Sequence, residues 1–294
     1  MRGCTTMFLI FWLSCTLPTH RETLELISLL DNGHVFETRF TKGDTGIYKG
    51  QGHLHLNRWT KTGTPVSFHF DSPPVVSEFK KDDIDFFGFR MYKEEDIWQL
   101  YIRSEEYNVS GQIRPNDEPS LSLKEEDWTI DILHPHAQLL GWSSTFGRSG
   151  MLKGDTVILH RYGTALLEEE RTLIIAFDST NHIGIEYSNL ASQSWGKWNT
   201  TSMRDEDITQ EMHAHHIDIS IQNEKLQFYI EAVMGEEDLY KHLSTAERLL
   251  SSQHLLTAPR TVLQGRLQRE NGKILPGVCF YQGEEPPTPS PKRQ

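Results

Sequence analysis

The sequence MHAHHIDISIQNEKLQFYIEAV, at residues 212–233, decides the fold class. In its first ten residues the odd positions hold only histidine or isoleucine, and the even positions are mostly polar or small. Such alternation is the period of a strand with one buried face. After the polar residues 222–224 the alternation resumes, so the stretch predicts a β-hairpin. His213 and His215 share the face of Ile217, and we expect both imidazoles to point toward an interior.

The same period-two pattern occurs along most of the chain. Residues 173–177 are apolar on both faces, which predicts a central strand covered on both sides. Turn signals such as Asp31-Asn32-Gly33 separate the runs. The other strand candidates are residues 24–30, 34–40, 46–59, 66–70, 86–92, 97–103, 128–133, 137–142, 156–162, 182–187, 261–268 and 273–281.

One late segment changes character. Residues 236–256 place leucines and an alanine at helical spacing, with acidic residues at the start and Pro259 after the end. This pattern predicts an α-helix over residues 236–256. The tail, residues 284–294, is proline-rich and charged, and we expect it to be disordered.

Composition limits the partners. The chain has 294 residues, with 41 acidic and 29 basic side chains and a net charge of -12. Such a surface repels nucleic acid and anionic membranes, so neither is a predicted partner. The length suits one large domain or two of moderate size, and the lack of a fixed repeat argues against a propeller or solenoid.

The N-terminus resembles a signal peptide. Arg2 precedes the apolar residues 7–13, which are too few to span a bilayer, and small residues follow at 14–16. We expect residues 1–18 to be removed and the protein to be secreted or periplasmic, with no membrane span in the mature chain. Cys15 loosely matches a lipoprotein acylation site, so a lipid anchor is an alternative, and a buried first strand is another.

Motifs of several enzyme and metal-site classes are missing. Of three cysteines, Cys4 and Cys15 lie within the signal segment, which leaves only Cys279 and excludes an internal disulfide. The chain has no GxSxG elbow, phosphate loop, HExxH or CxxC. No cofactor is predicted.

Three patches carry a family resemblance. They are LLDNGHVFETRFTKGDTGIYKG at residues 29–50, WTIDILHPHAQLLGW at residues 128–142, and Trp-Gly-Lys-Trp at residues 195–198. With them the chain resembles the lipocalin-like superfamily of the AttH proteins, carotenoid 1,2-hydratases and yeast survival-factor proteins. In that family two calycin-like β-domains pack together, and its members handle greasy molecules such as polyenes and sphingolipids.

The resemblance sets the expected architecture. It implies an antiparallel all-β protein with two calycin- or lipocalin-like barrel or sandwich domains, at residues 22–130 and 131–283, the second containing the helix. Hydratase-like members commonly carry Asp-His shortly before the Trp-Gly pair, where this chain has Ser192-Gln193. We therefore carry over no catalytic residue.

Histidines and tryptophans are the candidate ligand-binding residues. A cavity lining would use imidazoles as polar anchors or acid–base groups and indoles as apolar walls. The alternative is hydrogen-bonded or plain core packing. Paired histidines also suit zinc or copper, but no carboxylate stands at ligand spacing, so no metal site is predicted. The candidates are His213, His215, His53, His55, His134, His136, Trp142 and Trp195.

These observations favour an exported lipocalin-like protein that binds a lipophilic small molecule in a β-lined cavity. An isoprenoid or polyene hydratase or cyclase of the same superfamily, using acid–base catalysis, is the alternative. A carbohydrate-binding β-sandwich is a third interpretation. The sequence does not indicate an oligomeric state.

Overall fold

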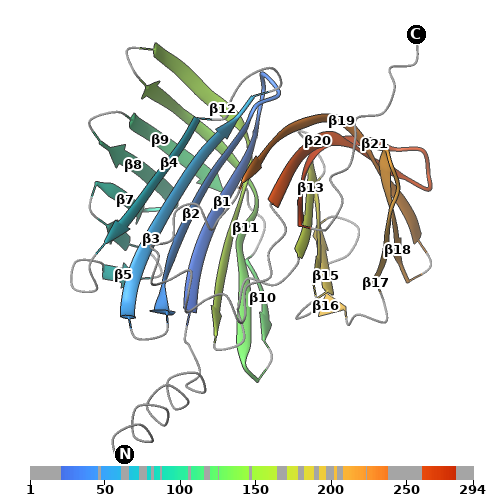
Figure 1. The fold of residues 1–294 in the computed structure, drawn as a ribbon, viewed down its shortest axis with the longest axis horizontal. Coiled ribbons are helices and arrows are strands. Elements are labelled where there is room, and N and C mark those ends of the chain that lie inside the picture. The colour runs from blue at the N-terminus through green and yellow to red at the C-terminus, as the bar shows by residue number, and fades with distance from the viewer. Residues whose placement is uncertain are drawn as a thin grey trace, which may run out of the picture.

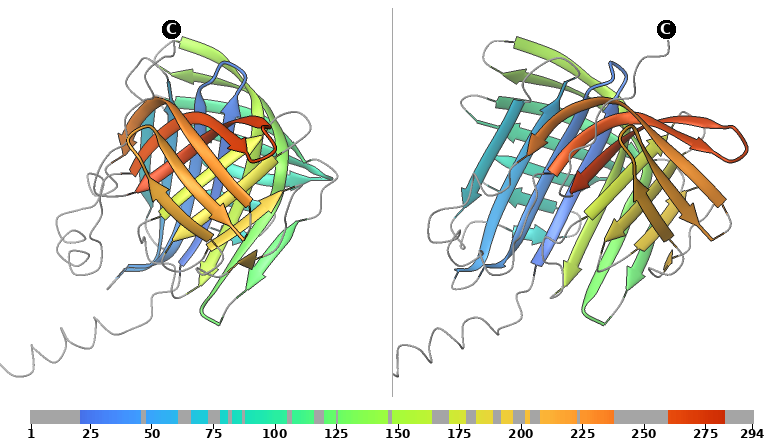
Figure 2. Two further views of the ribbon diagram at one scale, coloured as in Figure 1. Left: turned by 90° about the vertical axis from the view of Figure 1, so that its right-hand side faces the viewer. Right: turned by 45° about the vertical axis from the view of Figure 1, so that its right-hand side comes forward.

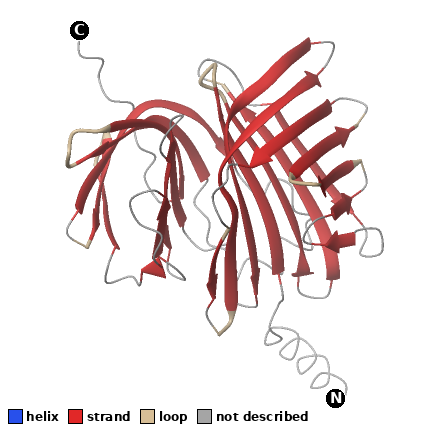
Figure 3. Cartoon of the chain, turned by 180° about the vertical axis from the view of Figure 1, so that it is seen from behind, coloured by secondary structure: helices blue, strands red, loops and turns tan. Residues whose placement is uncertain are grey.

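The computed structural model describes residues 21–282 except 46–47, 61–65, 73–77, 81–82, 87, 105–106, 116–119, 125, 146–147, 164–170, 178–181, 189–191, 197–201, 204–207, 223 and 238–259. All regular elements in the described residues are β-strands, as predicted (Figure 3). The described part of the chain has no helix long and apolar enough to cross a membrane.

The first sheet has 12 antiparallel strands, and the main path runs β4-β3-β2-β1-β12-β11-β9-β8-β7-β6-β5, with β10 paired to β11. It curls around its own apolar face (Figure 1). Its strands are β1 (Arg21–Leu30), β2 (Val35–Thr45), β3 (Tyr48–Trp59), β4 (Val66–Ser72), β5 (Glu78–Lys80), β6 (Asp83–Phe86), β7 (Phe89–Glu94), β8 (Ile97–Arg103), β9 (Tyr107–Pro115), β10 (Leu121–Lys124), β11 (Trp128–Thr145) and β12 (Arg148–Gly163).

The second sheet has 9 antiparallel strands in the order β16-β15-β14-β13-β21-β20-β19-β18-β17. It also curls, and it lies beside the first sheet (Figures 1 and 2). Its strands are β13 (Arg171–Phe177), β14 (His182–Ser188), β15 (Ser192–Gly196), β16 (Ser202–Met203), β17 (Ile208–Met212), β18 (His216–Ile221), β19 (Glu224–Glu237), β20 (Arg260–Arg269) and β21 (Ile274–Gln282).

Strand alternation divides the apolar residues among three cores. On β1, Leu24 and Leu26 face the inside of the first sheet, and Ile27, the next residue, faces the second sheet. On β13, Ile174 faces the inside of the second sheet and Leu173 faces the first. Each curled sheet thus has its own core, and a third core lies between the sheets. The doubly covered strand predicted at residues 173–177 is confirmed.

The predicted strand at residues 212–221 is wrong at its start. β17 ends at Met212, and β18 begins at His216. The backbone N–H of His213 donates to the carbonyl of His216 at 2.9 Å, which closes a turn between the two strands. The hairpin of β18 and β19 that follows is confirmed.

One further element boundary differs from the sequence prediction. β11 and β12 pair with β9 and β1, so the first sheet continues to Gly163, and the division of the chain into domains at residue 131 stays a prediction. β19 continues through Glu237, which pairs with Arg260, so the predicted helix does not begin at 236. Residues 238–256 of that helix, the signal segment and the tail lie outside the described residues.

Candidate functional site

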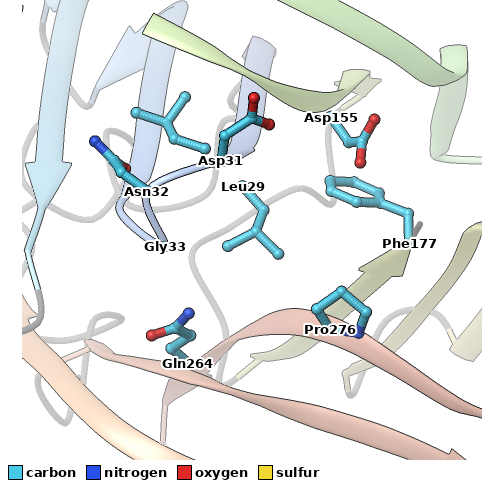
Figure 4. A pocket seen from close by; sticks show the side chains of 9 residues that line it. Leu29, Asp31, Asn32, Gly33, Asp155, Phe177, Gln264 and Pro276 are labelled. Carbon is cyan, nitrogen blue, oxygen red and sulfur yellow. The ribbon is translucent and has the colours of Figure 1, made fainter. Parts of the chain in front are cut away.

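A pocket of about 420 Å³ lies where the two sheets meet. Both sheets contribute to it, and the side chains surround an open space (Figure 4). Its lining is Leu29, Leu30, Asp31, Asn32 and Gly33 at the β1–β2 turn, Asp155 on β12, Phe177 at the end of β13, Gln264 on β20 and Pro276 on β21.

Local backbone chemistry shapes the first-sheet side of this pocket. Gly33 has a φ of 76°, a conformation that glycine adopts without strain, and its N–H donates to the carbonyl of Leu30 at 2.8 Å. Asn32 accepts the N–H of His34 at 3.0 Å, which stabilises the same turn. A Cβ at Gly154 would lie 2.1 Å from the carbonyl oxygen of Leu29, so the absence of a side chain lets β12 approach β1 next to the pocket.

Asp155 connects the pocket to a buried histidine. Its carboxylate lines the pocket and is 24% exposed, and its Oδ1 lies 3.2 Å from Nε2 of His136. The ring of His136 stacks on that of His182, with centroids 5.2 Å apart, and it tilts against the ring of Phe177 at 6.0 Å. An acid on the pocket wall with an imidazole behind it has the composition that proton transfer requires.

His134 and His136 separate instead of forming the predicted pair. The pairing of β11 with β12 shifts register between Ile132 and His134 and again between His134 and Ala137. His134 accepts a hydrogen bond from Nε1 of the buried Trp98 at 2.6 Å, on the inside of the first sheet. His136 faces Phe177 on the second sheet.

The two tryptophan candidates have different environments. Trp195 is 1% exposed and belongs to the core between the sheets, which confirms the core-packing alternative for this residue. Trp142 is 61% exposed on β11, and Met151 pairs with it on β12. Neither indole lines the pocket.

His213 and His215 do not share an interior face with Ile217, because both lie in the turn before β18. Nε2 of His213 instead lies 3.0 Å from the carboxylate of Asp218, on the half-exposed face of the hairpin. His213, His216 and Asp218 form the one group of three or more possible metal ligands found among the described residues. Their ligand atoms lie within 4.8 Å of one another.

His53 and His55 lie on β3, and the side chain of His53 is outside the described set. Nδ1 of His55 lies 3.6 Å from the carboxylate of Glu237, which belongs to the second sheet. His55 is therefore part of a buried network of charged and polar groups, called the inter-sheet ion network below. Its members are Glu25, Glu37, Arg39, His55, Asn57, Arg161, Glu186, Glu237 and Arg260.

Arg260 is the most connected member of the inter-sheet ion network. It donates to Glu37, and its guanidinium nitrogens lie 3.5 Å from Glu237 and 3.7 Å from Glu25. Its guanidinium carbon stands 4.2 Å from the ring centroid of Phe280. These partners come from both sheets, so Arg260 ties the sheets together.

Burial and neighbouring charges set the protonation of this network. Burial alone would lower the pKa of Arg260, but Glu37, Glu237 and Glu25 outweigh it and raise that pKa further above its usual range. Burial raises the pKa of Glu37. Burial would also raise the pKa of Glu237, but the hydrogen bond from His55 and the charges of Arg39 and Arg260 hold it well below its usual range.

Arg161 makes a second link between the sheets. Its Nη1 donates to Glu25 at 2.5 Å, and its Nη2 lies 3.2 Å from both carboxylate oxygens of Glu186 on β14. No member of the inter-sheet ion network lines the described pocket. We therefore interpret the network as fixing how the sheets pack.

The sequence did not single out most of the pocket. Asp155, Phe177, Gln264 and Pro276 come from four strands spread over more than a hundred residues, and no short motif contains any two of them. The turn Asp31-Asn32-Gly33 was recognised only as a turn. His136 was the one candidate placed beside this pocket.

No protein-family model and no curated protein sequence matches the chain. Among solved structures, a Nitrosomonas europaea protein assigned to the AttH group superposes with a TM-score of 0.65 at 10% identity, covering 91% of this chain and 93% of that one. The structure of CghA with Sch210972 superposes with a TM-score of 0.57 at 9% identity, covering 90% of this chain and 88% of that one. Kievitone hydratase from Nectria haematococca superposes with a TM-score of 0.51 at 10% identity, covering 92% of this chain and 91% of that one.

These likenesses show the fold. The chain has the AttH-like lipocalin fold, built from two calycin-like half-barrels, as the resemblance in the sequence predicted.

Proposed function

We propose that the chain binds a lipophilic small molecule in the pocket between the two sheets. The pocket itself is the observation that carries this proposal: its volume of about 420 Å³ lies in the usual range of ligand sites, about 300–1,000 Å³. Leu29, Phe177 and Pro276 supply apolar surface from three separate strands. An apolar ligand body would bury this surface on binding.

Polar groups at the pocket would orient the ligand. Asp155 presents a carboxylate, and the side-chain oxygen of Gln264 is buried without a hydrogen-bond partner among the described residues. A buried acceptor left unpaired costs about 1–3 kcal/mol, which a ligand hydroxyl would recover. We therefore expect a ligand with an apolar body and at least one hydrogen-bond donor.

Mass spectrometry of an organic extract from the native protein tests this proposal. Pro276→Trp should fill the pocket from an exposed strand position and reduce the amount of co-purified compound at least tenfold. Ile274→Trp is the matched control, because Ile274 is exposed on the same strand and does not line the pocket. Equal amounts of compound from both variants would mean that the ligand binds elsewhere.

A second candidate function is acid–base catalysis, which the contact between His136 and Asp155 favours. In a hydration, a protonated group of this pair would give its proton to one carbon of a double bond, while water adds to the other carbon and returns a proton to the pair. The fold neighbour named kievitone hydratase makes kievitone the first substrate to assay. His136→Gln should keep the affinity and lower turnover about 10²–10⁴-fold. If the wild type forms no product from any co-purified compound, acid–base catalysis is excluded as the function.

We also propose that the protein is exported and begins between Cys15 and Arg21 after signal cleavage. The apolar segment at residues 7–13 and the small residues after it support this proposal. N-terminal sequencing of protein made in its native host tests it. A cytosolic protein that retains residues 1–13 would contradict it.

A further inference from the structure

The turn between β17 and β18 brings two imidazoles and one carboxylate together. His213 lies in the turn, and His216 and Asp218 follow on β18 with side chains on the same half-exposed face. The rings of His213 and His216 stack with centroids 4.5 Å apart. The elements that carry this group, β17 to β19, contribute nothing to the lining of the pocket between the sheets.

The three side chains converge through specific atoms. Nε2 of His213 lies 3.0 Å from one oxygen of Asp218, and Nε2 of His216 lies 3.5 Å from the other. A carboxylate oxygen of Glu211, on β17, lies 3.8 Å from Nε2 of His213. Two neutral imidazoles and a carboxylate are a ligand set that zinc uses, and the bonds of about 2.0–2.2 Å need only a small closure of this group.

Neighbouring side chains hold the carboxylate in place. Nε2 of Gln227 donates to Oδ1 of Asp218 at 2.9 Å, and the hydroxyl of Tyr229 donates to Oε1 of Gln227 at 2.5 Å. Metal ligands are usually oriented by such outer hydrogen bonds.

We propose that His213, His216 and Asp218 bind a zinc ion, with Glu211 or water completing the coordination. The imidazole and carboxylate donors suit a borderline divalent ion rather than calcium or magnesium, which prefer oxygen ligands only. The bound ion would join the turn to β18. This site is independent of the function proposed for the pocket between the sheets.

Calorimetric titration of metal-free, untagged protein with ZnCl₂ at pH 7.5 tests the proposal. We expect one zinc ion to bind per chain. Each of the variants His213→Ala, His216→Ala and Asp218→Asn removes a proposed zinc ligand and should lower the affinity more than about 100-fold. Gln227→Ala should cost about 10–100-fold, the usual effect of removing an orienting group. His215→Ala is the control on the same turn and should bind like the wild type.

A measurement on the wild type keeps the test independent of the variants. In histidine-selective NMR, ZnCl₂ should shift the ring signals of His213 and His216 before those of any other histidine. Binding should weaken in acid, because protons compete with the metal for the imidazole nitrogens. The proposal would be overturned if the wild-type protein bound no stoichiometric zinc, or if the ring signals of other histidines shifted first.

Discussion

His136 and Asp155 lie 3.2 Å apart on adjacent strands of the first sheet, at a bulge in β11 where its pairing with β12 shifts register. Without the bulge, His134 and His136 would share one face, as their spacing predicts. The bulge turns His134 toward Trp98 inside the first sheet and leaves His136 facing the second sheet. The irregular pairing thus separates the two histidines and leaves one imidazole behind the carboxylate that lines the pocket.

Replacing Gly184 with alanine should destabilise the second sheet. A Cβ at Gly184 would lie 1.9 Å from Cε2 of Trp195, so the indole packs directly on the glycine backbone. Overpacking of this kind costs about 1–3 kcal/mol in the free energy of unfolding. Denaturant unfolding measures it. Gly150→Ala, where the nearest atom would be 3.5 Å away, is the control and should change stability by less than about 0.5 kcal/mol.

Removing the guanidinium of Arg260 should lower the free energy of unfolding much more than removing an exposed guanidinium. Arg260→Met leaves the buried carboxylate of Glu37 without its main partner and removes one of the partners of Glu237, and we expect a loss of about 3–5 kcal/mol in unfolding free energy. Arg266→Met on the same strand breaks an exposed pair with Glu231 and should cost less than about 1 kcal/mol. Equal losses would show that the inter-sheet ion network does not hold the sheets together.

Glu237 should make stability depend on acid pH. Its pKa is lowered in the fold, so between its ordinary value of 4.5 and its folded value the unfolded chain binds a proton that the folded chain does not. Its contribution to stability is therefore full at neutral pH and is lost as the pH falls through that window. Glu37, with a raised pKa, acts in the opposite direction.

The difference in unfolding free energy between wild type and Glu237→Gln measures this contribution separately. Denaturant titrations at pH 7, 5, 4 and 3 should show the difference largest at pH 7 and shrinking below about pH 4.5. A difference that stays constant over this range would show that Glu237 titrates normally in the folded protein.

Alternation predicted the sheets well because burial on one face sets the period of each strand. It failed at residues 212–215, where apolar and polar residues keep alternating through a turn that contains no glycine, proline or asparagine. Helical spacing of leucines after an acidic start placed the beginning of the helix at Glu236, where pairing with Thr261 continues β19 as a strand. Long-range pairing decided that position, and local propensity carries no information about it.

The candidate site was less predictable than the fold. His136 was recognised from its spacing to His134, but its real partner is Asp155, nineteen residues later on the next strand. Phe177, Gln264 and Pro276 reach the pocket only through the packing of one sheet on the other. The inter-sheet ion network was missed for the same reason, since Glu25 and Glu37 look like ordinary outward-facing positions in their strands.

A crystal structure of the protein with its co-purified compound tests the central proposal most directly. We expect the compound between the sheets, in contact with Phe177 and Pro276, with a hydrogen bond to Asp155 or Gln264. Electron density for the compound inside either curled sheet, or on the exposed surface around Trp142, would contradict a binding site at the junction of the sheets.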